Sequence, residues 1–336
     1  MKIAFIGIRH GHIHALYQLA CKHPGVEVVA ACEDDEPTRK ALAAAGKIKL
    51  THRDWRAMLA EVPCDIVACG DYYARRGEIL LAALAAGKHV IADKPICTQM
   101  AQWKRIAALS AAKGLAVGCQ LDMRSWGNLR TVRRLIAEGA IGPIQTVLFT
   151  GQHPLQFGTR PGWYFEPGKH GGTINDIAVH AFDAIPWVTG RTLAEVVAAR
   201  VWNASPDVCP GFQDGAQLML RMDNGGGVLG DVSYLAPDKV RFKVPQYWRF
   251  TFHGPGGSIE TTLSDPHVQV AAANQAELRK VPAEGAVPHS YFESFLREVT
   301  GEAGQRSPST AEVLEAARVS LAAQAAADSG ACHVAL

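Results

Sequence analysis

Residues 1–12 read MKIAFIGIRHGH, a short apolar run closed by a glycine and followed by the start of a helical pattern. Such a run is typical of a buried strand that turns directly into a helix. Strict alternation of strands and helices continues from there, and it predicts a doubly wound parallel sheet of the Rossmann type over residues 1–121. The later strands of this sheet are expected at 26–32, 66–69, 89–92 and 115–121.

The pattern changes after residue 121. Helix 125–138 and strand 144–151 are expected first, before an irregular stretch, 152–170, that is rich in glycine, proline and aromatic residues. Alternating strands then run from 196 to about 281, and helical patterns at 290–299 and 310–327 close the chain. We therefore expect a second domain, 122–336, of the α+β class. It should hold a large, mostly antiparallel open sheet with helices on one face, and the last helix can pack back on the first domain.

Composition excludes several classes of partner. The 336 residues are 48% hydrophobic, and 34 Lys plus Arg face 32 Asp plus Glu. There is thus no basic field for a nucleic acid or an anionic membrane. No apolar run is long enough to span a membrane, and the N-terminus enters a strand without a signal-peptide pattern. Eight scattered cysteines without a C-x-x-C pair indicate reduced core residues, so we expect a cytoplasmic protein.

The loop after the first strand is the expected place for a phosphate, because ligands of such sheets bind at the carboxyl ends of the strands. Compared with G-x-G-x-x-G, the loop keeps Gly7, has Arg9 and His12 at the second and third glycine positions, and carries a glycine at 11. Arg9 can offer its guanidinium to a pyrophosphate, although an ordinary tight turn is also possible. His10, His12 and His14 alternate and should point to different sides of the helix start, so no metal site is expected.

Three acids, Glu33-Asp34-Asp35, follow the second strand. A carboxylate at this place can hold the ribose hydroxyls of a dinucleotide. Three acids together would repel a 2′-phosphate, which favours NAD over NADP, although Arg9 acts in the opposite direction. At least one of Asp34 and Asp35 is expected to be a solvated surface residue.

Residues 171–183 read GGTINDIAVHAFD. If this stretch is helical, Asp176, His180 and Asp183 share one stripe of a helix whose other residues are mostly apolar. An acid and an imidazole on a half-buried helix must be paired, or they destabilise the fold. The stretch alone is equally compatible with a structural pair and with an active site.

Residues 86–95, AGKHVIADKP, strongly resemble the A-G-K-H-V-x-x-E-K-P signature of the glucose-fructose oxidoreductase / inositol dehydrogenase / rhizopine catabolism protein family (Gfo/Idh/MocA), with Asp93 in place of Glu. Segments 122–124 and 138–142 resemble the family's N-x-R and E-G-x-I-G, and 171–183 resembles its G-G-G-x-L-x-D-x-G-x-H-x-x-D. The similarity covers nearly the whole chain. It departs at 68–71, where the family has A-T-P-N, and at Arg76, which lies near the family's usual His.

This resemblance implies an NAD(P)-dependent enzyme that transfers a hydride between nicotinamide and a secondary alcohol of a sugar, sugar acid or cyclitol. By resemblance Lys94 supplies positive charge, His180 is the base and Asp176 holds or tunes the imidazole. Asp183 is expected to be a structural anchor. Family members often have a cis Lys-Pro bond in the signature. The expected cofactor-binding residues are Gly7, Ile8, Arg9, His10, Gly11, Glu33, Cys69, Asp71, Tyr72, Asp93 and Lys94.

Substrate contacts are expected from the irregular stretch and from the edges of the second domain. Trp163 and Tyr164 can stack on a sugar ring, and the basic members of the set can hold a carboxylate. The full set is Arg124, His153, Arg160, Trp163, Tyr164, Lys169 and His170.

Two other functions remain open. A relative of this kind can use NAD in a redox-neutral glycosidase or lyase cycle, and net release of NADH separates that activity from a dehydrogenase. The fold has also been recruited for non-enzymatic, dinucleotide-responsive regulators, but retention of Lys94, Asp176 and His180 argues against this function. An exposed sheet face in the second domain predicts a homodimer or homotetramer.

Overall fold

The computed structural model describes residues 1–304 and 307–336, which form two compact units. The first unit contains residues 1–120, 161–171 and 291–314. The second contains residues 121–160, 172–290 and 315–336. Each unit is therefore assembled from three separate stretches of the chain.

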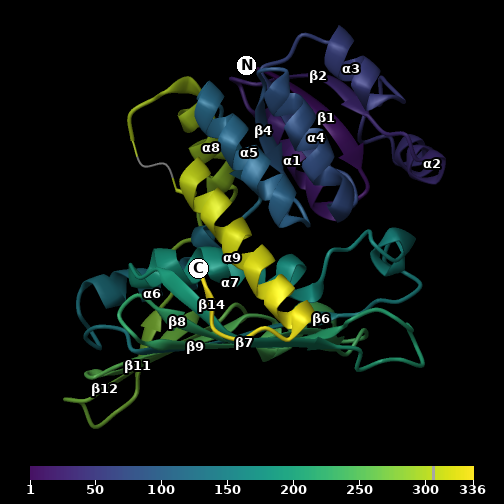
Figure 1. Cartoon of the computed structure of the whole chain (residues 1–336). Coiled ribbons are helices and arrows are strands. Elements are labelled where there is room, and N and C mark those ends of the chain that lie inside the picture. Colours follow the sequence, from purple (N-terminus) through teal and green to yellow (C-terminus); the bar gives the residue numbers. More distant parts are fainter. Residues whose placement is uncertain (305–306) are drawn as a thin grey trace. The chain divides into compact units, whose positions relative to one another are not determined.

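The first unit contains a five-stranded parallel sheet in the order β2-β1-β3-β4-β5, as the alternating pattern predicted. Strand order reverses between β1 and β3, and ligands of doubly wound sheets bind beyond the carboxyl ends of the strands at this point. The strands are β1 (Lys2–Ile8), β2 (Glu27–Cys32), β3 (Ile66–Gly70), β4 (His89–Ala92) and β5 (Val117–Cys119). The helices are α1 (Gly11–Lys22), α2 (Glu36–Ala45), α3 (Trp55–Glu61), α4 (Tyr73–Ala85), α5 (Met100–Lys113) and α8 (Ser290–Thr300), with a 3₁₀ turn, η2 (Gly162–Phe165) (Figure 1).

The core of the first unit needs residues from both ends of the chain. Ile3 and Phe5 of β1 are fully buried in a cluster that also contains Phe292 and Phe295 of α8. Gly7 ends the core of β1 with a φ of +72°, and a Cβ there would lie 2.6 Å from the Cα of Asp71. Only glycine therefore allows β1 to approach the end of β3 so closely.

The second unit contains a nine-stranded sheet in the order β13-β12-β11-β10-β6-β9-β8-β7-β14. It is mostly antiparallel, as predicted, but it is not a simple meander. β6 is inserted between β10 and β9 and pairs with β9 in parallel. The strands are β6 (Thr146–Pro154), β7 (Leu193–Trp202), β8 (Gly215–Met222), β9 (Gly227–Ala236), β10 (Arg249–Gly254), β11 (Gly257–Thr262), β12 (His267–Ala272), β13 (Arg279–Pro282) and β14 (Val334–Ala335).

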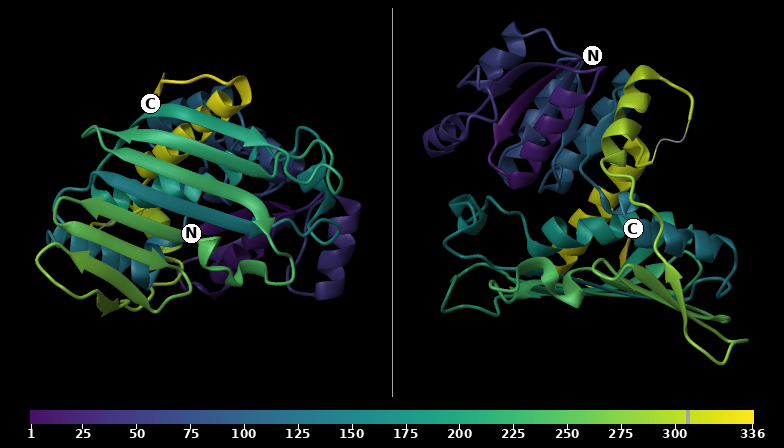
Figure 2. Two further views of the ribbon diagram at one scale, coloured as in Figure 1. Left: turned by 90° about the horizontal axis from the view of Figure 1, so that it is seen from below. Right: turned by 180° about the vertical axis from the view of Figure 1, so that it is seen from behind.

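Helices of the second unit cover one face of this sheet, and the other face is bare (Figure 2, left). They are α6 (Gly127–Ala137), α7 (Val179–Thr189) and the part of α9 (Thr310–Ser329) that starts at residue 315. Shorter elements are the 3₁₀ turns η1 (Met123–Ser125), η4 (Arg241–Lys243) and η5 (Pro245–Tyr247), and a π-helical turn, η3 (Ile174–Ala178).

All eight cysteines are free, and six of them are buried, with Cys21 and Cys332 exposed. Within residues 1–304 and 307–336, none of the helices combines the length and the apolar character needed to cross a membrane.

Candidate functional site

The turn after β1 is held by groups of the protein itself. The amides of Arg9 and His10 both donate to the carbonyl of Gly70, each over 3.1 Å. The amide of Ile8 donates to Glu33 over 2.7 Å. α1 begins at Gly11, and the first N–H groups of a helix have no partner within the helix. The first turn of α1, rather than the glycine loop before it, is thus the part of this segment that can receive a phosphate.

The acids after β2 have separate structural roles. Glu33 is buried and accepts hydrogen bonds from Ile8, from Arg9 Nε over 3.1 Å and from the Asp35 amide over 2.8 Å. Asp35 caps α2 by accepting the amide of Thr38 over 3.0 Å. Asp34 is the most accessible of the three side chains, at 34% exposed, which makes it the acid best placed to reach a ribose.

Two arginines balance this acidic edge. Asp34 pairs with Arg9 and, over 2.5 Å, with Arg75. The same two arginines lie 3.3 Å and 3.2 Å from the carboxylate of Asp71. Burial nevertheless raises the pKa of Asp71 to about 6, against the opposing effect of Arg9 and Arg75. Three carboxylates, those of Glu33, Asp34 and Asp71, and two guanidinium groups thus form one charged cluster at this edge of the sheet.

The signature turn at the end of β4 contains Lys94, which is 4% exposed, and a cis bond to Pro95. Arg76 of α4, fully buried, holds this turn. Its Nη1 donates to the carbonyls of Asp93, Lys94 and Pro95 over 2.9, 2.6 and 3.1 Å. Its Nη2 lies 3.2 Å from Asp93 Oδ2, and its Nε donates to the Asp71 carbonyl over 2.8 Å. Arg76 thus fixes the backbone on both sides of Lys94.

In the sequence, Arg76 stands out only as a departure from the family pattern. A further signal is that a helix begins at Tyr73, directly after a buried strand, and carries two consecutive arginines, Arg75 and Arg76, near its start. Consecutive residues of a helix point in different directions. One of these can reach solvent, while the other must enter the core and needs several acceptors there.

His10 lies at the N-cap of α1 and is 7% exposed. Its Nδ1 contacts Asp93 Oδ2, and its Nε2 lies 2.6 Å from the hydroxyl of Tyr164 and 3.3 Å from that of Tyr73. Burial lowers the pKa of His10 to about 4, although Asp93 opposes this effect. His10 and Arg76 hold the pKa of Asp93 well below its usual range, despite its burial. Neutral His10 therefore faces an ionised Asp93.

The expectation that His10, His12 and His14 point to different sides is wrong for the first two. His12 Nδ1 lies 3.2 Å from Asp93 Oδ1, so His10 and His12 reach the two oxygens of one carboxylate. The reason is that His10 has an extended backbone, with ψ at 142°, and does not follow the helical spacing of His12. His14 instead contacts the carbonyl of Ile8 over 3.3 Å.

The substrate-binding residues expected from sequence fall into two groups. Trp163, Tyr164 and His170 belong to the first unit. There Trp163 stacks on Tyr164 at 4.3 Å between ring centroids and meets Tyr73 edge-on at 4.9 Å. His170 lies 5.3 Å from Tyr164. Together with Tyr73 and His10 these rings form an aromatic cluster next to Asp93. Other predicted residues of the first unit have separate contacts. Cys69 is buried in β3, and the ring of Tyr72 lies 5.3 Å from the guanidinium of Arg9. Lys169 forms an ion pair with Glu166.

In the second unit the stretch 171–183 is not one regular α-helix. Residues 174–178 form a π-helical turn, and α7 follows from Val179. Asp176 and His180 therefore lie on opposite sides of the change in helical pitch, and the simple stripe predicted from α-helical spacing does not apply. Such π-turns occur frequently at functional sites.

Gln324 of α9 holds the start of this turn. Its Oε1 accepts the amide of Ile174 over 2.9 Å and that of Asn175 over 3.4 Å. Gly172 has a φ of +99°, and a Cβ there would lie 2.1 Å from the Gln324 side chain. Glycine at 172 is therefore needed both for the backbone and for the approach of α9.

Asp176 is 2% exposed and accepts a hydrogen bond from the hydroxyl of Tyr234 on β9. His180 is 7% exposed, and its ring meets Trp248 edge-on at 5.8 Å. His153 of β6 lies 6.2 Å from Tyr234 and 5.9 Å from Trp248. Arg160 places its guanidinium 5.2 Å from the Tyr234 ring. Tyr234 and Trp248 thus join these predicted residues into one aromatic-lined neighbourhood, and no sequence motif had pointed to either of them.

Arg124 is the predicted substrate residue for which the structure gives another role. Its guanidinium binds Asp183 through Nε, at 3.1 and 3.0 Å from the two carboxylate oxygens, and through Nη2 at 2.6 Å. Both residues are buried. This contact ties η1 to α7, and the binding of substrate by Arg124 stays a prediction.

Comparison with known proteins agrees with this architecture. Residues 1–121 match the model described as "Oxidoreductase family, NAD-binding Rossmann fold", and residues 129–260 match the "GFO/IDH/MocA C-terminal domain". The 1,5-anhydro-D-fructose reductase of Ensifer adhaerens is 28% identical over 209 residues, which cover 61% of each chain. The chain therefore spans about three fifths of the length of that relative.

Solved structures show the same fold over the whole chain. An oxidoreductase structure from Thermotoga maritima superposes with a TM-score of 0.85 at 24% identity and covers 100% of both chains. A levoglucosan dehydrogenase in complex with NADH and levoglucosan superposes with a TM-score of 0.79 at 21% identity, covering 100% of this chain and 99% of the other. The chain thus belongs to the Gfo/Idh/MocA family of oxidoreductases, with an NAD-binding Rossmann domain and the C-terminal domain of that family.

Proposed function

We propose that this chain transfers a hydride between NAD and a secondary alcohol of a sugar, sugar acid or cyclitol. The observation that carries the proposal is the buried Lys94 at the carboxyl end of β4, where Arg76 fixes the backbone carbonyls on either side of it. A lysine whose backbone is held in this way at the ligand edge of a dinucleotide-binding sheet can offer its ammonium group to the oxygen of a reacting alcohol. The levoglucosan dehydrogenase with the same fold was solved with NADH and a sugar.

Each unit supplies different groups to the proposed reaction. NAD supplies the hydride acceptor when it is bound. In the first unit, Lys94 stabilises negative charge on the substrate oxygen, and the first turn of α1 and Arg9 hold the pyrophosphate. In the second unit, His180 accepts the hydroxyl proton. Asp176, held by Tyr234, keeps the imidazole oriented and stabilises its protonated form.

We propose NAD rather than NADP as the cofactor. The carboxylates of Glu33, Asp34 and Asp71 outnumber the two arginines that pair with them, Arg9 and Arg75, so this cluster carries an excess of acid. A 2′-phosphate placed beside Asp34 would meet like charge. We expect kcat/KM with NAD to exceed that with NADP, and the reverse preference would contradict the proposed contact with Asp34.

A screen of sugars, sugar acids and cyclitols with NAD, read by absorbance of NADH, tests the reaction. We expect at least one of these compounds to be oxidised with net NADH release. Lys94→Met is the matched variant, because it removes the charge and keeps an unbranched side chain, and it should abolish turnover while NAD still binds. Tight NAD binding without oxidation of any compound would refute the dehydrogenase. Product formation without net NADH would instead support the redox-neutral cycle.

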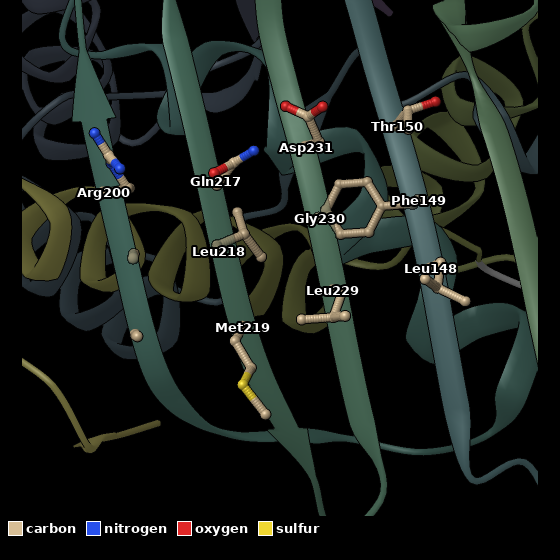
Figure 3. A pocket seen from close by; sticks show the side chains of 12 residues that line it. Leu148, Phe149, Thr150, Arg200, Gln217, Leu218, Met219, Leu229, Gly230 and Asp231 are labelled. Carbon is tan, nitrogen blue, oxygen red and sulfur yellow. The ribbon is translucent and has the colours of Figure 1, made fainter.

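The bare face of the second sheet supports the proposal of self-association (Figure 3). Leu229 of β9 pairs with Met219 of β8 on one side and with Leu148 of β6 on the other, and the three side chains are 38% to 46% exposed. The next row outward pairs Asp231 with Gln217 and Thr150, and Arg200 lies at its end. An apolar row beside a row of both charge signs suits a second copy of the same face.

Light scattering on Leu229→Arg tests this contact. We expect the wild-type chain to be a dimer or a larger even assembly and the variant to be a monomer, because the substitution buries two unpaired charges, one from each copy, in a two-fold interface. Val240→Arg is a control, since Val240 is also exposed but lies outside this sheet face. A monomeric wild type would refute the proposal.

A further inference from the structure

Three polar residues of α9 form a row on one face of this otherwise mostly apolar helix. Ser320, Gln324 and Asp328 are spaced by four residues, so their side chains lie one above the other. Ser320 is fully buried and Gln324 is 5% exposed, whereas Asp328 is exposed. A polar side chain destabilises the fold when it is buried without a hydrogen bond. The partners of the two buried members therefore show what this row does.

Both buried members of the row bind the π-turn η3. Gln324 Oε1 accepts the amides of Ile174 and Asn175. Its Nε2 donates to Asp328 Oδ1 over 3.0 Å, and since a carboxylate only accepts, this bond fixes which end of the Gln324 amide faces the turn. One helical turn earlier, Ser320 Oγ donates to Asn175 Oδ1 over 2.8 Å. Two side chains of α9 thus hold two consecutive residues of η3.

Gln324 supplies the cap that the residue before η3 does not. The first N–H groups of a helix have no partner within it and need an acceptor from elsewhere. Thr173 occupies the N-cap position, but its side chain forms no capping hydrogen bond. Its hydroxyl donates to the carbonyl of Gln213 instead. The acceptor for the start of η3 therefore comes from another helix, 150 residues further along the chain.

The pitch of η3 sets the direction of Asp176 relative to His180. A π-turn closes its hydrogen bonds over one residue more than an α-helix does. One residue of an α-helix corresponds to a rotation of about 100° around the helix axis. If residues 174–178 relaxed to α-helical pitch, Asp176 would turn by about this angle relative to α7, and it would lose the hydrogen bond from Tyr234. The two proposed catalytic residues thus keep their relative direction only while η3 keeps its π form.

We propose that Gln324 is a positioning residue for Asp176 and His180. By accepting the first amides of η3, Gln324 stabilises the π form of the turn, and Ser320 adds a second attachment through Asn175. The inference rests on the proposed function, in which His180 is the base and Asp176 orients its ring. Gln324 acts on this pair through the backbone of the turn, so its loss should change the properties of the base while cofactor binding in the first unit continues.

Kinetics of Gln324 variants test the proposal by activity. Gln324→Met removes the acceptor and keeps the length of the side chain, so kcat should fall about tenfold, less than for loss of the base itself, and its pH dependence should shift. KM for NAD should stay unchanged. Gln324→Glu keeps an acceptor at a helix start, where negative charge is favourable, and should retain most of the activity. Leu321→Ala, a buried residue of the same helix, is the control for lost packing and should keep the wild-type pH profile. Equal profiles for Gln324→Met and Leu321→Ala, or no rescue by Gln324→Glu, would overturn the proposal.

Ring-¹⁵N spectra of the full chain, labelled at histidine, test the same point without a substrate. The signals of His180 are assigned by their loss in His180→Asn. We expect Gln324→Met to shift them, and Ser320→Ala to shift them less, while Gln324→Glu and Leu321→Ala leave them in place. Unchanged His180 signals in Gln324→Met, or in Ser320→Ala where the first variant does not fold, would overturn the proposal. If no polyol is oxidised while the signals shift as expected, the proposed substrate class fails and the positioning of His180 by Gln324 stands.

Discussion

Each unit of the molecule contains a buried histidine and a nearby buried carboxylate, but the two sets are assembled in different ways. His10 and Asp93 are 83 residues apart in sequence and meet because β1 and β4 end at the same edge of a parallel sheet. Asp176 and His180 are four residues apart, on either side of the join between a π-turn and α7. The first set contacts the guanidinium of Arg76 and the imidazole of His12, whereas the second contacts the aromatic rings of Tyr234 and Trp248.

This difference indicates different tasks. Asp93 is held by both Arg76 and His10, so its negative charge is fixed and the first set suits a structural role. The His180 ring meets Trp248 edge-on, and Asp176 accepts a hydrogen bond from the hydroxyl of Tyr234. We propose the second set as the base that changes its charge during turnover.

The largest effect is expected in the second set, from replacement of the proposed base. His180→Asn should lower kcat by about 10² to 10⁴, because the base is lost and its shape is kept. Steady-state kinetics with the best polyol from the screen measure the loss, and His253→Asn is a control, since His253 is an exposed histidine of β10 in the same unit. A loss for His180→Asn no greater than that for the control would contradict the role of His180 as the base.

Arg76→Met tests whether fixed charge holds the first set together. Its loss leaves Asp93 buried without its cation, so we expect the free energy of unfolding to fall by about 3–5 kcal/mol. Urea denaturation measures this change. Arg56→Met is the control: Arg56 pairs with Glu78 at a surface where both side chains are more than half exposed, and it should cost under about 1 kcal/mol. Similar losses for both variants would contradict the role given to Arg76.

Acid pH should weaken the first set through His10. Its pKa falls from 6.5 to about 4 on folding, so the unfolded chain binds the proton more tightly than the folded one. The stabilisation is complete above pH 6.5 and is lost as the pH falls through 4, by about 3 kcal/mol in all.

The variant His10→Asn lacks this titrating group, so comparison with the wild type isolates the contribution of His10 to the free energy of unfolding. Asp71, with its pKa raised to about 6, acts in the opposite direction below pH 6, but it is present in both proteins. The difference in unfolding free energy between wild type and His10→Asn should therefore shrink as the pH falls from 7 to 4. A difference that does not change with pH would show that His10 titrates normally.

The smallest effect is expected from replacement of Tyr234, which donates a hydrogen bond to Asp176 of the second set. Tyr234→Phe removes the hydrogen bond to Asp176 and keeps the ring, so kcat should fall about tenfold, which corresponds to about 1.4 kcal/mol. The pH dependence of kcat should shift as well, since Asp176 then holds His180 less firmly. Phe212→Leu, beside the Tyr234 ring at 5.4 Å, is a control for packing alone. An unchanged pH profile would make the contact merely structural.

Much of the fold could be predicted, because apolar runs with glycine at their ends give both the strands and their alternation with helices. The second sheet was predicted as mostly antiparallel, but the insertion of β6 beside β9 could not be, since strand order depends on contacts between distant residues. The π-turn was also missed. Its widened helix depends on Gln324 and Gly172, which are about 150 residues apart.

The candidate sites likewise contain residues that a sequence motif can reveal and partners that it cannot. Short motifs pointed to Lys94, Asp176 and His180 through spacing and resemblance, and their roles stay predictions until the variants are measured. The partners that give these residues their surroundings, Arg76 and Tyr234, come from other elements and carry no motif. Arg124 is a motif residue whose guanidinium binds the buried Asp183, and its contact with substrate stays a prediction.

The dependence of the first core on α8 has a consequence during synthesis. A ribosome that has released residues 1–121 has made every strand of the parallel sheet, but Phe292 and Phe295 follow about 170 residues later. At translation speeds of about 5–20 residues per second, the apolar side of these strands waits roughly 10 to 30 s for its cover. The nascent N-terminal half is therefore a natural client for chaperones, and slow codons between the two segments should lower the yield of folded protein.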